Sequence, residues 1–554
     1  MHRLLTLHNP AEARRHYASG LWQDDTLYSL AAHWAAERGE TPAVRDHHRR
    51  FSWGELLAEA DRVAAALHQC GLKAGDRVSV WMSNRIEAVA IFLACSRNGY
   101  VFNTSLHATY GAGEVATLLD QVSSRALFAE VGHGAGGGRD DIFAMARSQT
   151  ETRAIFALPR RDDDASRLPA MAYPDKAGAP LPPVSSDPDQ VVYLAFTSGT
   201  TGAPKAVMHS NNTLLANARA MVSDWGFGQE TVLLTLSQMS HHIGTVALCQ
   251  TLVGGFELVL NDVTAGHHPI DWIEQTNATY VMGVPTHAMD ILAALADRGQ
   301  ARLGQVKVFY LAGAPIPRVT AQSLLDRGIT PQNVYGMTEN GSHQYTLPND
   351  DVNTITSTCG KACAAYEIAI FDQNDRDVAV ANGEIGEIAG RGAMRMLGYF
   401  NNQASTEGAF NADGWFLSGD LGRVNEQGNL EIVGRSKDII IRGGHNIHPA
   451  RIEDLAMRHP AVTKAAAVPV ADERLGEKVC LVVTGTEPID GGALLEFLAE
   501  EGLSKYDMPE FFGQTERLPL GPTGKVLKRE LVQWLRAGTL APQTVRWRTS
   551  GVIL

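Results

Sequence analysis

One segment near the middle of the chain restricts its possible folds more than any other. Residues 191–196 form a run of β-branched, aromatic and aliphatic side chains, which is typical of a buried β-strand. The run ends in TSGTTGAPK (197–205), which contains four Ser/Thr hydroxyls, two glycines and a terminal Pro-Lys. Because glycine permits positive φ and close approach of the backbone, such a loop can present its N–H groups to a ligand. The segment therefore predicts a strand that leads into a polyphosphate-binding loop.

This loop differs from the Walker A motif of P-loop nucleotide-binding proteins. Walker A requires Gly-Lys-Ser/Thr, whereas here Pro204 precedes Lys205 and Ala206 follows it. The hydroxyls add hydrogen-bond donors, Lys205 adds a cation, and a helix from Asn211 adds its N-terminal dipole if it packs nearby. A polar surface turn with no ligand has a similar composition. The length of the loop and its Pro-Lys ending favour the polyphosphate site.

The rest of the first two hundred residues alternates between helical and strand patterns. Apolar side chains recur at helical spacing in 55–70 and 86–98, and a β-rich run, 77–82, lies between them. Helix, strand and helix joined by short Gly/Asp/Asn connections indicate a layered α/β domain. The composition of 132–188, with its Gly-rich start and Pro/Ser-rich end, predicts surface loops before the next strand.

A chain of 554 residues is long enough for more than one domain. The pattern changes near GRSKDIII, and beyond it two helices and one strand are predicted, at 449–458, 492–501 and 479–484. These elements suffice for a small second domain. We place the boundary so that 1–435 forms a large multi-layer α/β domain, with sheets flanked by helices, and 436–554 forms a small α+β domain.

Charge and composition exclude several classes of protein. A net charge of −13 argues against a nucleic-acid binder, which needs a basic surface to neutralise phosphates. An acidic enzyme still binds a nucleotide when a few cations and backbone amides converge. The longest apolar stretch, 243–260, is interrupted by polar residues and glycines, so we expect no membrane span. With no apolar signal-peptide core in 1–17 and no CxxC among six cysteines, we expect a cytoplasmic protein.

The loop at 197–205 resembles the SGTTGxPK signature of the adenylate-forming superfamily, which includes acyl-CoA synthetases, firefly luciferases and the adenylation domains of peptide synthetases. Further motifs follow in the superfamily's order, namely YGMTE at 335–339, SGD at 418–420, GRSKD at 434–438 and Gly-Lys at 524–525. The resemblance covers nearly the whole chain. It implies an adenylating N-terminal domain and a mobile C-terminal lid with its hinge at Lys437.

The resemblance also implies where ATP, Mg²⁺ and coenzyme A bind. Tyr335 lies beside adenine, Thr338 contacts the adenylate phosphate, and Thr200 and Glu339 hold magnesium, which prefers oxygen ligands. The glycines of RGGHN approach the pantetheine channel of coenzyme A after the lid moves. The full set of implied cofactor-binding residues is Thr197, Ser198, Gly199, Thr200, Thr201, Gly202, Lys205, Gly313, Ala314, Pro315, Tyr335, Gly336, Met337, Asp420, Arg435, Gly443 and Gly444.

Four residues take catalytic roles by the same resemblance: Lys525, Thr338, Glu339 and His241. A carboxylate at Asp420 accepts hydrogen bonds from the ribose hydroxyls, and Arg435 reaches the ribose as well. His241 aligns with an HxxG element beside the acyl group, although the residues before it differ from the superfamily's Pro-Leu-Phe. A paired His at a helix start is otherwise a polar cap.

These assignments predict an ATP-dependent acyl-CoA ligase for a small-molecule carboxylic acid. The sequence around YGMTEN and RGGHNIHPARIE most resembles that of ligases for short- to medium-chain or alicyclic acids such as cyclohexanecarboxylate. Aromatic acids remain possible substrates. Two other functions remain: an enzyme that loads a carrier protein in trans, and a catalytically silent nucleotide-binding scaffold. A lysine acetyltransferase acting on Lys525 would remove its charge and is a further expected partner.

Overall fold

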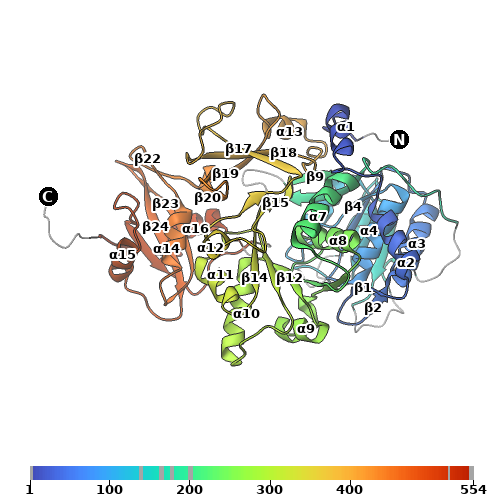
Figure 1. Ribbon diagram of the computed structural model, residues 1–554, viewed down its shortest axis with the longest axis horizontal. Coiled ribbons are helices and arrows are strands. Elements are labelled where there is room, and N and C mark those ends of the chain that lie inside the picture. The colour runs from blue at the N-terminus through green and yellow to red at the C-terminus, as the bar shows by residue number, and fades with distance from the viewer. Residues whose placement is uncertain are drawn as a thin grey trace.

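The computed structural model describes residues 4–135, 141–160, 168–174, 180–197, 204–521 and 525–547. A large N-terminal part carries a small C-terminal part at one side (Figure 1). The strands of these segments form four sheets, two of which make the framework of the large part.

The first of these has the strand order β7 (Met171–Ala172), β6 (Ala154–Leu158), β5 (Ser124–Glu130), β3 (Arg77–Trp81), β4 (Val101–Asn103), β8 (Val191–Thr197) and β9 (Lys205–Ser210). The second has the order β16 (Lys361–Ala362), β15 (Gly341–Tyr345), β14 (Thr330–Met337), β13 (Val308–Leu311), β12 (Tyr280–Gly283), β10 (Val232–Thr235), β11 (Glu257–Leu260), β1 (Pro42–Arg45) and β2 (Arg50–Ser52). Most neighbours in both sheets pair in parallel, which is the arrangement that helices cover on the faces.

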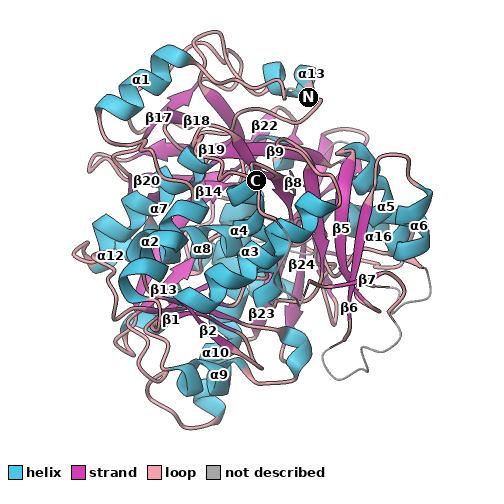
Figure 2. Cartoon of the chain, turned by 90° about the vertical axis from the view of Figure 1, so that its right-hand side faces the viewer, coloured by secondary structure: helices cyan, strands magenta, loops and turns pink. Residues whose placement is uncertain are grey.

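A layer of helices fills the space between the two sheets (Figure 2). One hydrophobic cluster joins them to residues of both sheets, such as Phe102 and Tyr280. The layer comprises α2 (Leu27–Arg38), α3 (Trp53–Gln69), α4 (Ile86–Asn98), α7 (Asn211–Trp225) and α8 (His242–Gly254). Helices outside this layer are α1 (Pro10–Ala18), α5 (Ala112–Gln121), α6 (Ile142–Ser148), α9 (Pro269–Thr276), α10 (Pro285–Asp297), α11 (Arg318–Leu325), α12 (Val352–Ser357) and α13 (Gln403–Gly408).

The predicted helices α3 and α4 are confirmed, and their sequences explain their ends. Ser52 caps α3 and forms a reciprocal capping box with Glu55. Helix α4 is buried along its whole length because it lies between two sheets, so its sequence is mostly apolar and its polar residues lie near its two ends. It ends at Gly99, whose φ of 70° is left-handed and suits glycine.

The expectation of surface loops throughout 132–188 is wrong in part. This range contains α6 and the buried strand β6, which pairs in parallel with β5 from Ala126↔Ala154 onward. The strand is a short apolar run, AIFAL, and the Gly-, Pro- and charge-rich segments around it dominate the composition of the range.

The sequence left open whether the N-terminus of α7 packs near the loop that follows Thr197, and the strand pairing shows that it does not. Strands β8 and β9 form an antiparallel hairpin in which Thr197 pairs with Lys205 and Val191 pairs with Ser210. Helix α7 follows Ser210, so it begins at the end of the hairpin away from the 198–204 loop. The 6 residues of β9 place about 20 Å between them. The α7 dipole therefore does not act on that loop.

The other two sheets meet where the chain passes into the small part. The four-stranded sheet is β17 (Tyr366–Phe371), β18 (Gly386–Gly392), β19 (Phe416–Val424) and β20 (Leu430–Arg435). The last sheet is β22 (His445–Ile447), β21 (Ile440–Arg442), β24 (Gly476–Gly485), β25 (Phe511–Gln514) and β26 (Gln543–Thr544), with β23 (Val462–Asp472) also paired to β24. A 3-10 turn, Ser436–Asp438, connects the two.

The small part has its own core. Helices α14 (Pro449–Ala456) and α15 (Gly491–Glu500) supply apolar side chains to one cluster, and α16 (Lys528–Arg536) packs on the other face of the sheet. The predicted fold class, a large layered α/β domain with a small α+β domain, is confirmed. Over the described segments, no helix is long and apolar enough to cross a bilayer.

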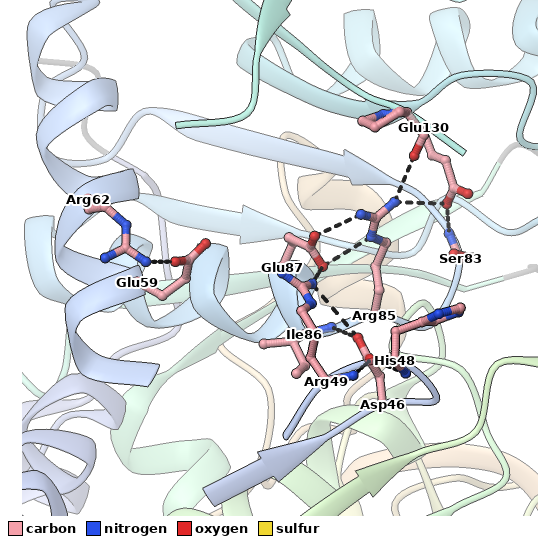
Figure 3. A network of polar contacts seen from close by, with 11 residues as sticks. Asp46, His48, Arg49, Glu59, Arg62, Ser83, Arg85, Ile86, Glu87 and Glu130 are labelled. Carbon is pink, nitrogen blue, oxygen red and sulfur yellow. Dashed lines mark hydrogen bonds and ion pairs between the residues drawn. The ribbon is translucent and has the colours of Figure 1, made fainter. Parts of the chain in front are cut away.

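A buried ion-pair network ties the loop after β1 to the start of α4 and to β5 (Figure 3). Glu87 accepts hydrogen bonds from Arg85 at 2.7 and 3.0 Å and forms an ion pair with Arg49 at 2.7 Å. The Arg85 and Glu87 side chains are 8% and 6% exposed. Glu130, on β5, accepts the Ser83 N–H at 2.8 Å and lies 3.9 Å from Arg85.

We expect Glu87→Gln to lower the free energy of unfolding by about 3–5 kcal/mol, because the Arg85 guanidinium stays buried without its contacting carboxylate. Thermal denaturation would show the change as a lower midpoint. The control is Arg423→Gln, which removes an exposed ion pair with Glu431 and should leave the midpoint unchanged. Equal midpoints for Glu87→Gln and the wild type would contradict the prediction.

Candidate active site

Asp420 lies on β19 opposite Arg435, the last residue of β20. Its Oδ1 is 3.0 Å from Arg435 Nε, and its Oδ2 accepts the Tyr335 hydroxyl at 3.0 Å. Burial raises the pKa of Tyr335 well above its usual value, so the phenol keeps its proton and donates. The carboxylate is thus a buried acceptor of fixed orientation, flanked by one aromatic ring and one cation.

Glu339 follows the end of β14 and is also buried. Its Oε1 accepts the Tyr399 hydroxyl at 3.0 Å, and the ring of Tyr399 lies 4.8 Å from Lys205 Nζ. Burial raises the pKa of Glu339, and the charge of Lys205 opposes that shift. Glu339, Tyr399 and Lys205 therefore form one cluster at the end of the β8–β9 hairpin.

Thr338, between Tyr335 and Glu339, is fixed through its backbone. Its carbonyl oxygen accepts His209 Nε2–H at 2.6 Å, and His209 Nδ1 in turn lies 3.0 Å from the Thr213 hydroxyl. Burial lowers the pKa of His209 to about 4, so the ring is a neutral donor. A methyl group at Gly336 would overlap the carbonyl oxygen of Gly341, so only glycine fits there.

Lys525 comes from the small domain and reaches the residues of the large one. Burial and the nearby charge of Arg435 lower its pKa to about 8, while Asp420 and Glu339 are close enough to oppose that shift. Its carbonyl accepts the Gly521 N–H at 2.8 Å. The structure therefore brings Lys525 into the same site as the two buried carboxylates.

Gly443 and Gly444 lie in the turn between β21 and β22, with φ values of 59° and 85°. The Gly443 N–H donates to Leu475 at 2.7 Å, inside the small domain. In this conformation the charge of Lys525 interacts with those of Asp420 and Glu339.

Gly313, Ala314 and Pro315 follow β13 at the carboxyl end of the parallel strands. Gly313 has a φ of 90°, and the Ala312 N–H donates to Gly283 at the end of β12. Tyr335, Gly336 and Met337 end the neighbouring strand β14. Ligands of α/β sheets bind at this edge, so the predicted nucleotide residues converge where the topology favours a site.

His241 precedes α8 but makes no capping hydrogen bond with its side chain. Its ring stacks on His107 with 4.3 Å between centroids, and His107 Nδ1 lies 3.3 Å from the Ser240 hydroxyl. Burial lowers the pKa of His241 to about 3, which keeps the ring neutral. The alternative that His241 is a polar cap is therefore wrong.

Five predicted residues of the loop, Ser198, Gly199, Thr200, Thr201 and Gly202, lie outside the described residues. Thr197 and Lys205 flank them and pair with each other across the hairpin.

Two residues of the site were missed by the sequence analysis, His209 and Tyr399. His209 had a signal, because residues two and four positions after Lys205 on a strand share its face. Tyr399 had none, since nothing in GYFNN indicates a carboxylate partner.

The family profile described as "AMP-binding enzyme" matches residues 31–400, and "AMP-binding enzyme C-terminal domain" matches 451–525. The chain belongs to the AMP-binding enzyme family. The resemblance to the adenylate-forming superfamily is thus confirmed, and the protein is an adenylate-forming acid–thiol ligase.

The relatives of this AMP-binding enzyme match it over nearly their whole length. The medium-chain fatty-acid–CoA ligase of Escherichia coli (strain K12) is 29% identical over 92% of this chain and 90% of its own. Enterobactin synthase component E of the same organism is 30% identical over 94% and 97%. The crystal structure of ATP-bound MatB from Rhodopseudomonas palustris has a TM-score of 0.78 at 26% identity, covering 92% of this chain and 99% of that one.

Proposed function

We propose that the protein is an AMP-forming acyl-CoA ligase. It joins a carboxylic acid to ATP, which releases pyrophosphate, and then transfers the acyl group from AMP to the thiol of coenzyme A. The observation that supports the proposal best is that the charge of Lys525, from the small domain, is near enough to Asp420 and Glu339 of the large domain to interact with both. A relative named as a fatty-acid–CoA ligase supports coenzyme A as the acceptor. The thiol of a carrier protein is the alternative, since another relative is a component of enterobactin synthase.

In the first step a carboxylate oxygen bonds to the α-phosphorus of ATP and the bond to pyrophosphate breaks. Both reactants are anions, so the site must offset their repulsion. Lys525 and Lys205 supply positive charge at this edge of the sheet, and no general base is needed because the nucleophile is already ionised. Asp420 and Arg435 hold the ribose and Tyr335 lies beside adenine, which orients the reactants.

The residues present fit a magnesium ion held jointly with the nucleotide. Mg²⁺ is commonly bound by one or two carboxylates together with substrate phosphates. In the part of the chain that the structure describes, no group of three or more metal-binding side chains occurs, and Glu339 is the buried carboxylate next to Lys205. Glu339, and Thr200 by the resemblance, would hold the ion, which neutralises charge on the phosphates.

In the second step the thiol must reach the carbonyl carbon from which AMP leaves. Lys525 occupies the site in the present conformation, so the small domain has to turn before the thiol can approach. A rotation about Lys437, in the 3-10 turn between the two domains, withdraws Lys525 and brings in Gly443 and Gly444.

Pyrophosphate release across straight-chain, alicyclic and aromatic acids, with and without coenzyme A, tests the proposal. An acyl-CoA ligase gives acid-dependent release that becomes multiple-turnover only with coenzyme A, and the best acid identifies the substrate class. Release that stays at one turnover with coenzyme A would support a carrier protein as acceptor. Absence of release with every acid would support a silent nucleotide-binding scaffold.

We expect adenylation to weaken as the pH rises through about 8, because Lys525 loses its positive charge there. The charged form is the active one, so activity is retained below that pH and lost above it. Bound ATP adds negative charge and raises the pKa of Lys525, so kcat falls at a higher pH than kcat/KM. ATP–pyrophosphate exchange measures both. Lys525→Arg should remove the alkaline fall, since guanidinium stays charged, and an unchanged profile in that variant would contradict the assignment.

A further inference from the structure

The segment 393–400, which we term the clamp segment, runs beside strand β9. The Met208 N–H donates to Gly398 at 3.0 Å, the Leu397 N–H donates to Met208 at 2.8 Å, and the Phe400 N–H donates to Ala206 at 2.8 Å. The clamp segment also holds the backbone of Glu339, whose carbonyl accepts the Met396 N–H at 2.7 Å. It therefore connects the strand that carries Lys205 with the turn that carries Glu339.

Within the clamp segment, only the side chain of Tyr399 is placed between those two charged groups by the contacts described. The hydroxyl donates to Glu339 Oε1, because an ionised carboxylate only accepts. The ring face meets Lys205 Nζ at 4.8 Å from its centre, within the range of a cation–π interaction. Tyr399 is 7% exposed and its own N–H is held by the Thr406 hydroxyl at 3.0 Å, so its position is fixed.

We propose that Tyr399 is the positioning residue that joins metal binding to phosphate binding in this enzyme. Its hydroxyl donates to Oε1 of Glu339, which fixes the orientation of the carboxylate that would hold the cation. Hydrogen bonds of this kind orient metal ligands in proteins and strengthen metal binding. Its ring holds the ammonium group of Lys205 at the end of the phosphate loop. The inference rests on the proposed function, in which Glu339 binds the metal ion.

The clamp segment also contacts the N-terminal arm, residues 4–22. Trp22 Nε1–H donates to the Ala393 carbonyl at 2.8 Å, and the Leu7 N–H donates to Leu397 at 2.9 Å. Arg395 forms an ion pair with Glu12 at 3.0 Å. The clamp segment is therefore held by both β9 and the N-terminal arm, and these contacts fix where Tyr399 lies relative to Glu339.

Binding of Mn²⁺, used as a paramagnetic probe in place of Mg²⁺, tests the inference without relying on turnover. The loss of the free Mn²⁺ signal in electron paramagnetic resonance would be followed with a non-hydrolysable ATP analogue present. We expect Tyr399→Phe, which keeps the ring, to weaken Mn²⁺ binding by about tenfold. Binding of the analogue without metal should be unchanged. Tyr399→Leu also removes the ring and should weaken metal-free binding by about threefold.

Tyr173→Phe is the matched control, because the Tyr173 hydroxyl is buried with no hydrogen-bond partner in the described part of the chain. Its Mn²⁺ affinity should equal that of the wild type. Glu339→Gln distinguishes the metal-binding role of Glu339 from the positioning role of Tyr399. If this variant binds Mn²⁺ normally, the proposed metal role of Glu339 fails. If it loses Mn²⁺ while Tyr399→Phe does not, the role of Tyr399 is overturned and that of Glu339 stands.

Discussion

Replacing Lys525 with alanine is expected to lower the rate of acyl-adenylate formation by about 10²–10³-fold, the cost of removing one charge-stabilising donor from an active site. The charge of this ammonium group interacts with those of Asp420 and Glu339, the two buried carboxylates of the proposed nucleotide site. The second half-reaction should remain largely intact, because the thiol attacks only after Lys525 has moved away. ATP–pyrophosphate exchange measures the first step, and acyl-CoA formation from pre-made acyl-adenylate measures the second.

Two variants control for this result. Lys525→Arg retains a positive charge and should recover part of the first step. Lys478→Ala removes another lysine of the small domain, one that pairs with Asp472 at 2.5 Å, and should leave adenylation unchanged. Equal loss of both half-reactions in Lys525→Ala would contradict the movement of the small domain, and full adenylation would exclude Lys525 from the first step.

Replacing Asp420 with asparagine is expected to lower kcat/KM for ATP by about 10²-fold, or about 3 kcal/mol, because hydrogen bonds to a charged group contribute about 1.5–3 kcal/mol each. The change weakens acceptance of the ribose hydroxyls and removes the ion pair with Arg435. The KM for the carboxylic acid should change much less, since the acid does not contact the ribose.

A comparison of ATP with 2′-deoxy-ATP tests directly whether Asp420 binds the ribose 2′-hydroxyl. The wild type should discriminate between the two nucleotides, and the Asp420→Asn variant should discriminate less, because the partner of the hydroxyl has been weakened. Glu431→Gln, which breaks an exposed pair with Arg423 on the same two strands, should retain the wild-type discrimination. Undiminished discrimination in Asp420→Asn would contradict ribose binding by this residue.

The spacing of apolar residues predicted several helices and strands because these elements form according to their own local sequence. Helix α4 was expected at the limits it has, 86–98, since apolar side chains recur in it at helical spacing and a glycine follows it. Strand β6 was missed because its five apolar residues are surrounded by segments rich in glycine, proline and charged residues. The position of α7 relative to the loop stayed open for another reason. Whether the chain continues from the loop into a helix or into a second strand depends on pairing with β8, and the sequence of β9 alone does not show that pairing.

Some residues of the candidate site can likewise be predicted from local sequence, and others only from the folded structure. Asp420, Arg435, Glu339 and Lys525 were identified because each belongs to a motif that can be read along the chain. Tyr399 lies 60 residues from Glu339 in sequence, and only the folded chain brings the two together. His209 was accessible in principle through its register with Lys205, but its contact with the Thr338 carbonyl depends on packing between two sheets.

The contact between the N-terminal arm and the clamp segment bears on how this enzyme should be trimmed or recombined with others. The family profile begins at residue 31, whereas Leu7, Glu12 and Trp22 contact the segment that carries Tyr399. A shortened protein cut at the profile's edge would keep every recognised motif and still lose these contacts with the segment that holds Tyr399 against Glu339. The part of the chain that supports the candidate site thus begins before residue 31, where the family profile starts.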